Sequence, residues 1–227
     1  MREDMKYNDG IYQLRENQID LIKRIMINNK EAIPGGVVFY GDSITELYDI
    51  DKFYTEIKIK YNSGVGGFTS ETLLWIIDEG VIKYKPKVVV LGVGTNDLGN
   101  ASMRSPRDIS YNIQESIRMI SNNLEGVEII VLSVHPCNEE SNGPKAGKVL
   151  RSNRIIKALN EEIELICKRF DNVTFKNVFD VLYNKESGNI YDEYTTDGLH
   201  LTEEAYVRLT KEIKPLILEK VYKTIYT

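Results

Sequence analysis

The chain has 227 residues, of which 42% are hydrophobic and 28% are charged, and its formal net charge is −5 at pH 7. This length and composition are typical of a globular protein with a hydrophobic core. The negative charge disfavours binding to nucleic acid or to an anionic membrane. The start of the chain lacks the apolar run of a signal peptide, and no apolar stretch is long enough to span a bilayer. We therefore expect a cytoplasmic protein with no nucleic-acid partner.

Helix and strand patterns alternate along the chain. Apolar residues at helical spacing predict a helix over 11–28, and an apolar run predicts a buried strand over 37–40. Further strands are predicted over 57–61, 87–91, 127–134 and 173–175. Further helices are predicted around 73–77, over 107–123 with Ser105 as N-cap and Pro106 in the first turn, over 149–169 and over 203–222.

Strands separated by helices favour an α/β fold of three α/β/α layers, in which helices cover both faces of a parallel sheet. The sequence contains no internal repeat and no linker-like segment. We therefore expect a single domain over 1–227, with 1–35 as an N-terminal helical extension packed on it. The helix of this extension could instead form the contact of a homodimer, and the sequence does not decide between the two.

Four segments carry residues that could take part in catalysis. Ser43 follows the first predicted strand, the glycines of 64–67 follow the second, and Gly92–Asp97 follows the third. The loops after successive parallel strands gather at one edge of the sheet, so these three segments share a side of the molecule. The fourth segment, Asp197–His200, precedes the last helix and is expected to reach the same edge.

These residues fit the requirements of nucleophilic catalysis. A serine hydroxyl such as that of Ser43 needs a base, and His200 is the candidate base, with Asp197 orienting its ring. Attack on an ester carbonyl also places negative charge on the carbonyl oxygen, which must be stabilised by hydrogen-bond donors. The backbone N–H groups of Ser43 and Gly67 and the side-chain amide of Asn96 are the candidate donors of this oxyanion hole.

Gly41-Asp42-Ser43, the glycines of 62–67, Gly94–Asp97 and Asp197–His200 together resemble the four sequence blocks of the SGNH hydrolases, also called the GDSL family. The resemblance covers about 36–201 and preserves the order of the blocks. The second block is most similar to the branch of platelet-activating-factor acetylhydrolase-like and bacterial acetylesterase-like proteins. One departure is an isoleucine at position 44, where the family's name has leucine.

The resemblance implies a flavodoxin-like sheet of five parallel strands and ester hydrolysis through a Ser-His-Asp triad. By matching motif positions, Ser43 would be the nucleophile, Asp197 and His200 the remaining triad residues, and Gly67 and Asn96 oxyanion donors. The expected substrate is a small-molecule ester with a short acyl group, such as acetyl, on a carbohydrate or other small alcohol. The alternatives are a lysophospholipase or thioesterase of the same fold, and a non-catalytic binding protein that keeps the fold.

Other residues near this edge are expected to have supporting roles. Phe68, Tyr48 and Leu98 are candidates for the substrate pocket, and His135, at the end of the fourth predicted strand, is interpreted as a wall of that pocket. The loop over 136–148 could be a lid, a subunit contact or a surface loop without a role.

Asp42 and Asp97 are expected to make structural hydrogen bonds, and Cys137 and Cys167 to be free thiols. Two histidines and two cysteines give no metal-ligand spacing. No nucleotide-binding glycine motif is present either, so neither a metal nor a cofactor is expected.

Overall fold

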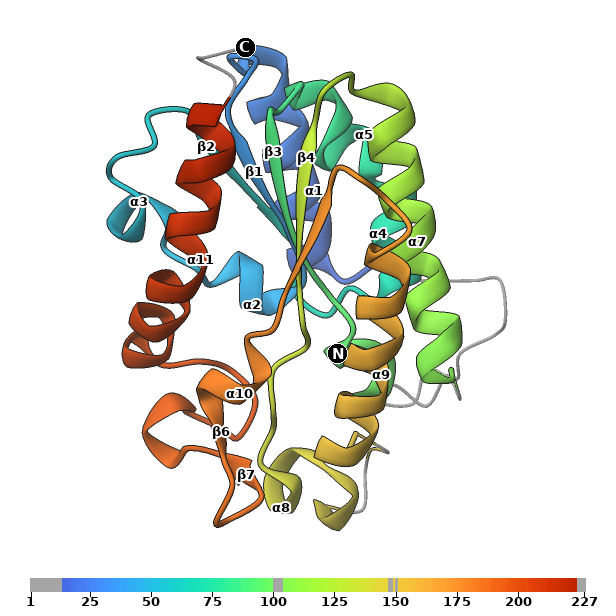
Figure 1. Cartoon of the computed structure of the whole chain (residues 1–227), viewed down its shortest axis with the longest axis vertical. Coiled ribbons are helices and arrows are strands. Elements are labelled where there is room, and N and C mark those ends of the chain that lie inside the picture. The colour runs from blue at the N-terminus through green and yellow to red at the C-terminus, as the bar shows by residue number, and fades with distance from the viewer. Residues whose placement is uncertain (1–13, 100–103, 147–148, 150, 224–227) are drawn as a thin grey trace.

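A computed structural model describes residues 14–99, 104–146, 149 and 151–223 (Figure 1). Its centre is a sheet of five strands, all parallel, in the order β2-β1-β3-β4-β5. The strands are β1 (Val37–Gly41), β2 (Lys60–Gly64), β3 (Val88–Gly92), β4 (Glu128–Leu132) and β5 (Val173–Lys176). A two-stranded antiparallel hairpin, β6 (Tyr183–Asn184) and β7 (Asn189–Ile190), lies beyond the sheet. The flavodoxin-like sheet expected from the sequence is confirmed.

Helices cover both faces of the sheet, with α11 on one side and α7 and α9 on the other (Figure 1). None of the helices in the described part of the chain is long and apolar enough to cross a membrane. The long helices are α1 (Glu16–Asn28), α7 (Pro106–Asn123), α9 (Asn153–Cys167) and α11 (Glu203–Lys223). The short ones are α2 (Ser43–Glu46), α3 (Ile50–Phe53), α4 (Ser70–Trp75), α5 (Ile77–Gly80), α6 (Thr95–Gly99), α8 (Glu139–Asn142) and α10 (Phe179–Leu182).

The central strands supply side chains to two hydrophobic cores, one on each face of the sheet. Successive side chains of a strand point to opposite faces. Val38 and Tyr40 therefore pack in the core under α7 and α9, whereas Phe39 packs in the core under α11. A strand buried on both faces is apolar without interruption, which explains the continuous apolar runs of β1 and β3.

The register of the sheet aligns the ends of its first three strands. Gly41 at the end of β1 pairs with Gly64 of β2 on one side and with Gly92 of β3 on the other. The loops that follow these strands therefore leave the sheet at the same level. This level is the carboxyl edge beside the switch point of the strand order, where ligands bind in open α/β sheets.

The beginning of α7 agrees with the sequence prediction. The Ser105 hydroxyl accepts a hydrogen bond from the backbone N–H of Asp108, and the Asp108 carboxylate accepts one from the backbone N–H of Ser105. Pro106 occupies the first helical position, where its missing N–H costs nothing. The face of α7 turned to the sheet buries an isoleucine on nearly every turn: Ile109, Ile113, Ile117 and Ile120.

Several predicted boundaries were wrong. The strand predicted over 57–61 is β2, Lys60–Gly64, because Ile57 is buried in the core under α11 rather than paired in the sheet. The helix predicted around 73–77 is divided into α4 and α5 at Ile76. The helix predicted over 149–169 begins only at Asn153, where Ser152 caps it, and the hairpin β6–β7 was not predicted.

The helix predicted over 11–28 is present as α1, and residues 11–13 lie outside the described part of the chain. Polar contacts attach its C-terminal half to the rest of the molecule. The Tyr84 hydroxyl donates to the Ile25 carbonyl, and the Asn29 amide donates to the carbonyl and the carboxylate of Glu79. The described part of the extension therefore packs on the helices beside the sheet.

Candidate active site

Ser43 lies at the start of α2, directly after β1. The Asp42 side chain caps this helix by accepting a hydrogen bond from the Ile44 N–H at 3.0 Å. Gly41 allows β3 and α2 to pack closely against the end of β1, because a Cβ at this position would overlap the Gly92 carbonyl oxygen and the Thr45 hydroxyl. A side chain at position 41 would therefore displace β3 or α2. The turn places Ser43 at the carboxyl edge of the sheet.

The side chains of Ser43, His200 and Asp197 form a hydrogen-bonded row. His200 Nε2 lies 3.1 Å from Ser43 Oγ, although the two residues are 157 positions apart in the sequence. His200 Nδ1 lies 2.7 Å from Asp197 Oδ2. Since a carboxylate can only accept, Nδ1 carries the proton, and Nε2 is left to accept from the Ser43 hydroxyl.

The second oxygen of Asp197 holds the backbone of its own loop. Oδ1 accepts hydrogen bonds from the N–H groups of Leu199 and His200, at 2.9 and 2.8 Å. Partial burial alone would raise the pKa of Asp197. The hydrogen bonds from the His200 ring and from the two N–H groups outweigh it, so the pKa lies below its usual value. Asp197 is therefore ionised at neutral pH.

Helix α8 and the residue before it support the Asp197 loop from outside. The Asn138 N–H donates to the Gly198 carbonyl at 2.8 Å, and the side chains of Ser141 and Asn142 both donate to the Asp197 carbonyl. The loop over 136–148 thus contains a helix, and its described residues contact the segment that carries His200. This contact was not foreseen from the sequence.

The loop after β2 brings Gly67 close to Ser43. A Cβ on the neighbouring Gly66 would lie 3.7 Å from the Ser43 Cβ, so the two segments are in contact. Gly67 has a φ of +79°, a left-handed conformation that glycine adopts without strain. The Gln18 side chain of α1 donates to the Gly66 carbonyl at 2.7 Å and so fixes the peptide unit that contains the Gly67 N–H.

Asn96 extends from α6 toward the same loop. Its side-chain nitrogen donates to the Phe68 carbonyl at 2.9 Å, one residue beyond Gly67. An amide nitrogen carries two N–H groups, so this bond orients the amide and leaves a second donor. The structure thus brings the three predicted donor residues, Ser43, Gly67 and Asn96, to one region.

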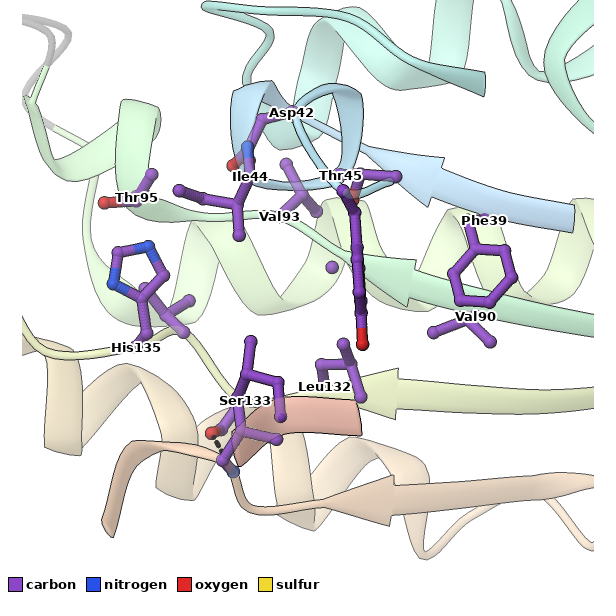
Figure 2. Close-up of a pocket in the computed structure, with 15 residues that line it drawn as sticks. Phe39, Asp42, Ile44, Thr45, Val90, Val93, Thr95, Leu132, Ser133 and His135 are labelled. Atoms are coloured by element: carbon purple, nitrogen blue, oxygen red, sulfur yellow. Dashed lines mark hydrogen bonds between the residues drawn. The ribbon is translucent and has the colours of Figure 1, made fainter. Parts of the chain in front are cut away.

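A small cavity of about 50 Å³ lies beneath α2 (Figure 2). Two of the predicted pocket residues, Tyr48 and His135, line it, together with Asp42 and Ile44 on either side of Ser43. The other two predicted pocket residues, Phe68 and Leu98, do not line this cavity. They are buried in the core under α7 and α9, where apolar neighbours surround them.

The two aspartates near Ser43 are buried and bonded to backbone, as expected. Burial raises the pKa of Asp42 to about 7, although the Ile44 N–H bond lowers it. Burial likewise raises the pKa of Asp97 to about 6, against hydrogen bonds from the N–H and the hydroxyl of Ser70. Cys137 and Cys167 are free, and burial raises their thiol pKa values to about 11 and about 12. Neither thiol is a nucleophile at neutral pH.

Two supporting residues were missed. Gln18 was not singled out, because a polar residue in an amphipathic helix usually faces solvent. Arg151 is 4% exposed, and it donates to the carbonyls of Thr95 and Asn142, which connects α6 to α8. No motif marks either residue. Over the residues that the structure describes, no group of three or more His, Cys, Asp or Glu side chains is placed to hold a metal.

The chain resembles known proteins in both sequence and structure. Residues 39–208 match the family model described as GDSL-like Lipase/Acylhydrolase family. Platelet-activating factor acetylhydrolase IB subunit alpha2 from Gallus gallus is 29% identical over 83% of this chain and 78% of its own length. A GDSL-like lipase from Bacteroides thetaiotaomicron is 27% identical, covers 87% of this chain and 97% of its own, and superimposes with a TM-score of 0.76. A structure from Streptococcus pneumonia named for platelet activating factor is 28% identical, covers 89% of this chain and 93% of its own, and has a TM-score of 0.80.

Proposed function

Because the chain belongs to the GDSL-like lipase/acylhydrolase family and is an ester hydrolase of that family, we propose that it removes short acyl groups through an acyl-enzyme formed on Ser43. The observation that carries this proposal is the row of hydrogen bonds from Ser43 through His200 to Asp197. A binding protein has no need of a base and an orienting carboxylate behind its serine.

In the first step, Ser43 Oγ attacks the ester carbonyl carbon while His200 Nε2 accepts the hydroxyl proton. The carbonyl oxygen becomes an oxyanion, which the N–H groups of Ser43 and Gly67 and the Asn96 amide would stabilise. Each such donor is worth about 3 kcal/mol of barrier in comparable enzymes. Asp197 holds the ring in the tautomer that leaves Nε2 free, and it stabilises the imidazolium that forms.

In the second half, the carbon–oxygen bond to the alcohol breaks, and the alcohol leaves with the proton from His200. Water then attacks the acyl-enzyme, His200 accepts its proton, and the same oxyanion donors act again. The free acid leaves, and the proton returns to Ser43 Oγ. The cycle needs no metal and no redox cofactor.

The cavity supports a short acyl group. Asp42 and Ile44, which flank Ser43 in the sequence, line the cavity beneath α2, although Ser43 itself does not, and the cavity volume of about 50 Å³ leaves room for a small group only. The avian relative is itself named an acetylhydrolase. We propose an acetyl-sized group on a carbohydrate or other small alcohol. The same relative supports an acetylated lipid as a second candidate, and a lysophospholipase or thioesterase would require a much longer acyl group.

An acyl-chain series of aryl esters tests the proposal. We expect kcat/KM to be highest for the two-carbon ester and to fall steadily by eight carbons. Ser43→Ala should lose activity by about 10⁴-fold or more with an unchanged circular dichroism spectrum. A Ser110→Ala variant is the matched control, because the Ser110 hydroxyl donates to the Arg107 carbonyl within α7 and, in the described part of the chain, does not contribute to the row of hydrogen bonds at Ser43.

The alternatives give different results. Rates that rise with chain length would identify a lysophospholipase or thioesterase. A folded protein that is inert to every ester and to a serine-directed organophosphate would be a binding protein. If the acetyl ester is preferred, kcat/KM for an acetylated sugar and for an acetylated phospholipid would then show whether the alcohol part of the substrate is a carbohydrate or a lipid.

A further inference from the structure

The side chain of Asn62, in β2, is bonded to the end of the short helix that carries Ser43. Its amide nitrogen donates to the Thr45 carbonyl at 2.7 Å and to the Tyr48 carbonyl at 3.1 Å. The Glu46 carbonyl, at 3.4 Å from the same nitrogen, shares these hydrogens. The last carbonyls of a helix need donors from outside it. Asn62 supplies such donors at the C-terminal end of α2.

The amide oxygen of Asn62 is bonded to its own strand. It accepts a hydrogen bond from the Gly64 backbone N–H at 2.9 Å. Carbonyl oxygens can only accept, so the amide nitrogen must face α2 and the amide oxygen must face β2. Gly64 itself packs against α2, because a Cβ at this position would overlap the backbone of Thr45 and Glu46. One side chain therefore joins the end of α2 to the end of β2.

Helix α2 depends on contacts of this kind. It has only four residues, and a helix of this length is not stable on its own. Asp42 caps its beginning, and the Tyr206 hydroxyl of α11 donates to the Ile44 carbonyl at 2.9 Å. These two bonds hold α2 to β1 and to α11. The bonds of Asn62 add the connection of α2 to β2.

The two elements that Asn62 joins lead to two donors of the proposed oxyanion hole. The Ser43 N–H lies at the start of α2, and the Gly67 N–H lies in the loop that follows β2. One oxyanion must accept from both groups at once, so their spacing determines how well they stabilise it. A change in the position of α2 relative to β2 would change this spacing.

We propose that Asn62 is a positioning residue that sets the spacing between the Ser43 and Gly67 N–H groups. This inference rests on the proposed ester hydrolysis. Asn62 acts through α2 and β2 and does not touch the substrate. Formation and hydrolysis of the acyl-enzyme both pass through an oxyanion, so a wrong spacing slows both steps. Loss of Asn62 should therefore lower kcat and leave KM nearly unchanged.

Two substitutions of Asn62 test this role. Asn62→Ala removes all of its hydrogen bonds, and we expect kcat for a two-carbon aryl ester to fall about 10- to 100-fold, with KM within about twofold of the wild type. Asn62→Asp keeps the acceptor for the Gly64 N–H but turns a carboxylate oxygen toward the carbonyls of α2. At pH 8 it should lose at least as much activity as Asn62→Ala. A wild-type kcat in Asn62→Asp overturns the proposal.

Asn172→Ala is the matched control. The Asn172 amide also donates two hydrogen bonds, to the Ser121 hydroxyl and to the Val127 carbonyl, both at 3.0 Å. It precedes β5, at the end of the sheet opposite to Ser43. Asn172→Ala should lower thermal stability as Asn62→Ala does and keep the wild-type kcat. Equal losses of kcat in the two variants overturn the proposal, because Asn62 would then support the fold only.

A short alkyl boronic acid tests the spacing without turnover. Ser43 Oγ bonds to the boron, the hydroxyl proton passes to His200 Nε2, and an oxygen of the tetrahedral adduct takes the place of the oxyanion. The inhibition constant should rise in Asn62→Ala by about the factor by which kcat falls, and it should not change in Asn172→Ala. An unchanged inhibition constant in Asn62→Ala overturns the proposal.

The pH dependence of kcat/KM separates the oxyanion donors from the base. The hydrogen bonds of His200 to Ser43 and Asp197 do not involve Asn62, so the acid limb of the profile should be the same in Asn62→Ala as in the wild type. A shifted acid limb would mean that Asn62 acts through His200, which overturns the proposal. Failure of the proposed function is a different result, in which the wild type neither hydrolyses the ester nor binds the boronic acid.

Discussion

Asp197 makes use of both carboxylate oxygens, one toward the His200 ring and one toward the backbone of its own loop. These two tasks can be separated by mutation. In Asp197→Asn, the amide oxygen can still accept from the loop N–H groups, so the loop keeps its shape. The amide nitrogen of the substituted side chain then faces His200 Nδ1. Because this nitrogen is a hydrogen-bond donor, Nδ1 must be unprotonated to accept from it, and the ring proton moves to Nε2. The ring is held in the tautomer that cannot accept the Ser43 proton.

We therefore expect Asp197→Asn to lower kcat by about 10⁴-fold with little loss of thermal stability. Asp197→Ala, which also removes the loop contacts, should lower both. The measurements are steady-state kinetics and thermal unfolding of the three proteins. Near wild-type activity in Asp197→Asn would show that the carboxylate is not needed to orient the base.

Asp42 gives the protein a pH-dependent stability. Burial raises its pKa from about 4 in the unfolded chain to about 7 in the native state, so the native state binds the extra proton between these values. The stabilisation is complete below about pH 4 and is lost as the pH rises through 7. Raising the pH from 5 to 8 should therefore lower the free energy of unfolding.

Asp42→Asn should remove this pH-dependent part of the free energy of unfolding, because asparagine can still cap α2 but does not titrate. We expect the loss of stability between pH 5 and pH 8 to be about 2 kcal/mol smaller in the variant than in the wild type. Urea denaturation at both pH values measures it. Asp97 titrates in both proteins, and its charge raises the pKa of Asp42 by less than burial does, so burial of Asp42 dominates the difference. Equal pH dependence in the two proteins would mean that Asp42 is ionised in the native state well below pH 7.

At the scale of elements, α1 supports a catalytic loop to which it is not connected in sequence. Gln18 donates to the Gly66 carbonyl, and the same peptide unit carries the Gly67 N–H that would stabilise the oxyanion. Gln18→Ala removes this donor. We expect kcat to fall about 10-fold with little change in KM, because the affected donor acts mainly in the transition state.

Asn29→Ala is the control for general loosening of the helix. Asn29 attaches the other end of α1 to Glu79, and among the described residues its side chain donates to Glu79 and not to the catalytic loop. The Asn29→Ala substitution should mainly lower the thermal stability, and its effect on kcat should be smaller than that of Gln18→Ala. If both variants lower kcat equally, Gln18 acts only by holding α1 in place.

The elements also show which parts of the structure could be predicted from the sequence. β1, β3 and α7 were predicted to within about two residues, because continuous apolar runs mark the two strands, and Ser105 as N-cap followed by Pro106 marks the start of the helix. β2 was misplaced, because Ile57, Ile59 and Tyr61 alternate like a strand while Ile57 packs in a core instead. Alternation reports which residues are buried, and it does not report which backbone groups pair.

The residues of the candidate site also fall into those that the sequence could place and those that it could not. Ser43, Gly67 and Asn96 follow strands, so topology alone places them at one edge. The contact of His200 with Ser43 follows from motif order and not from local structure. The roles of Gln18, Asn62 and Arg151 depend on packing between distant segments, for which the sequence contains no local signal.

For the molecule as a whole, the sheet joins two cores that should unfold together. Ile129 and Ile130 are adjacent in β4, both fully buried, and they face opposite cores. Ile129→Ala and Ile130→Ala should each cost about 2–5 kcal/mol. In each variant, near-ultraviolet and far-ultraviolet circular dichroism should report the same urea midpoint, as expected of the single domain proposed here.

Ile33→Ala is the exposed control, since Ile33 is 59% exposed, and it should change stability by less than about 0.5 kcal/mol. Two separate transitions in either core variant would contradict a single cooperative unit. They would show that the layers on the two faces of the sheet fold independently.

The distance of 157 residues between Ser43 and His200 has a consequence for synthesis of the protein. A nascent chain that has folded β1 to β4 already presents the serine, but it has no base to activate it. His200 is translated after all five strands of the sheet, just before α11, which covers one face of the sheet. Hydrolytic activity should therefore appear only after the segment that carries His200 has been made, and the recovery of activity during refolding should report when this segment docks on the sheet.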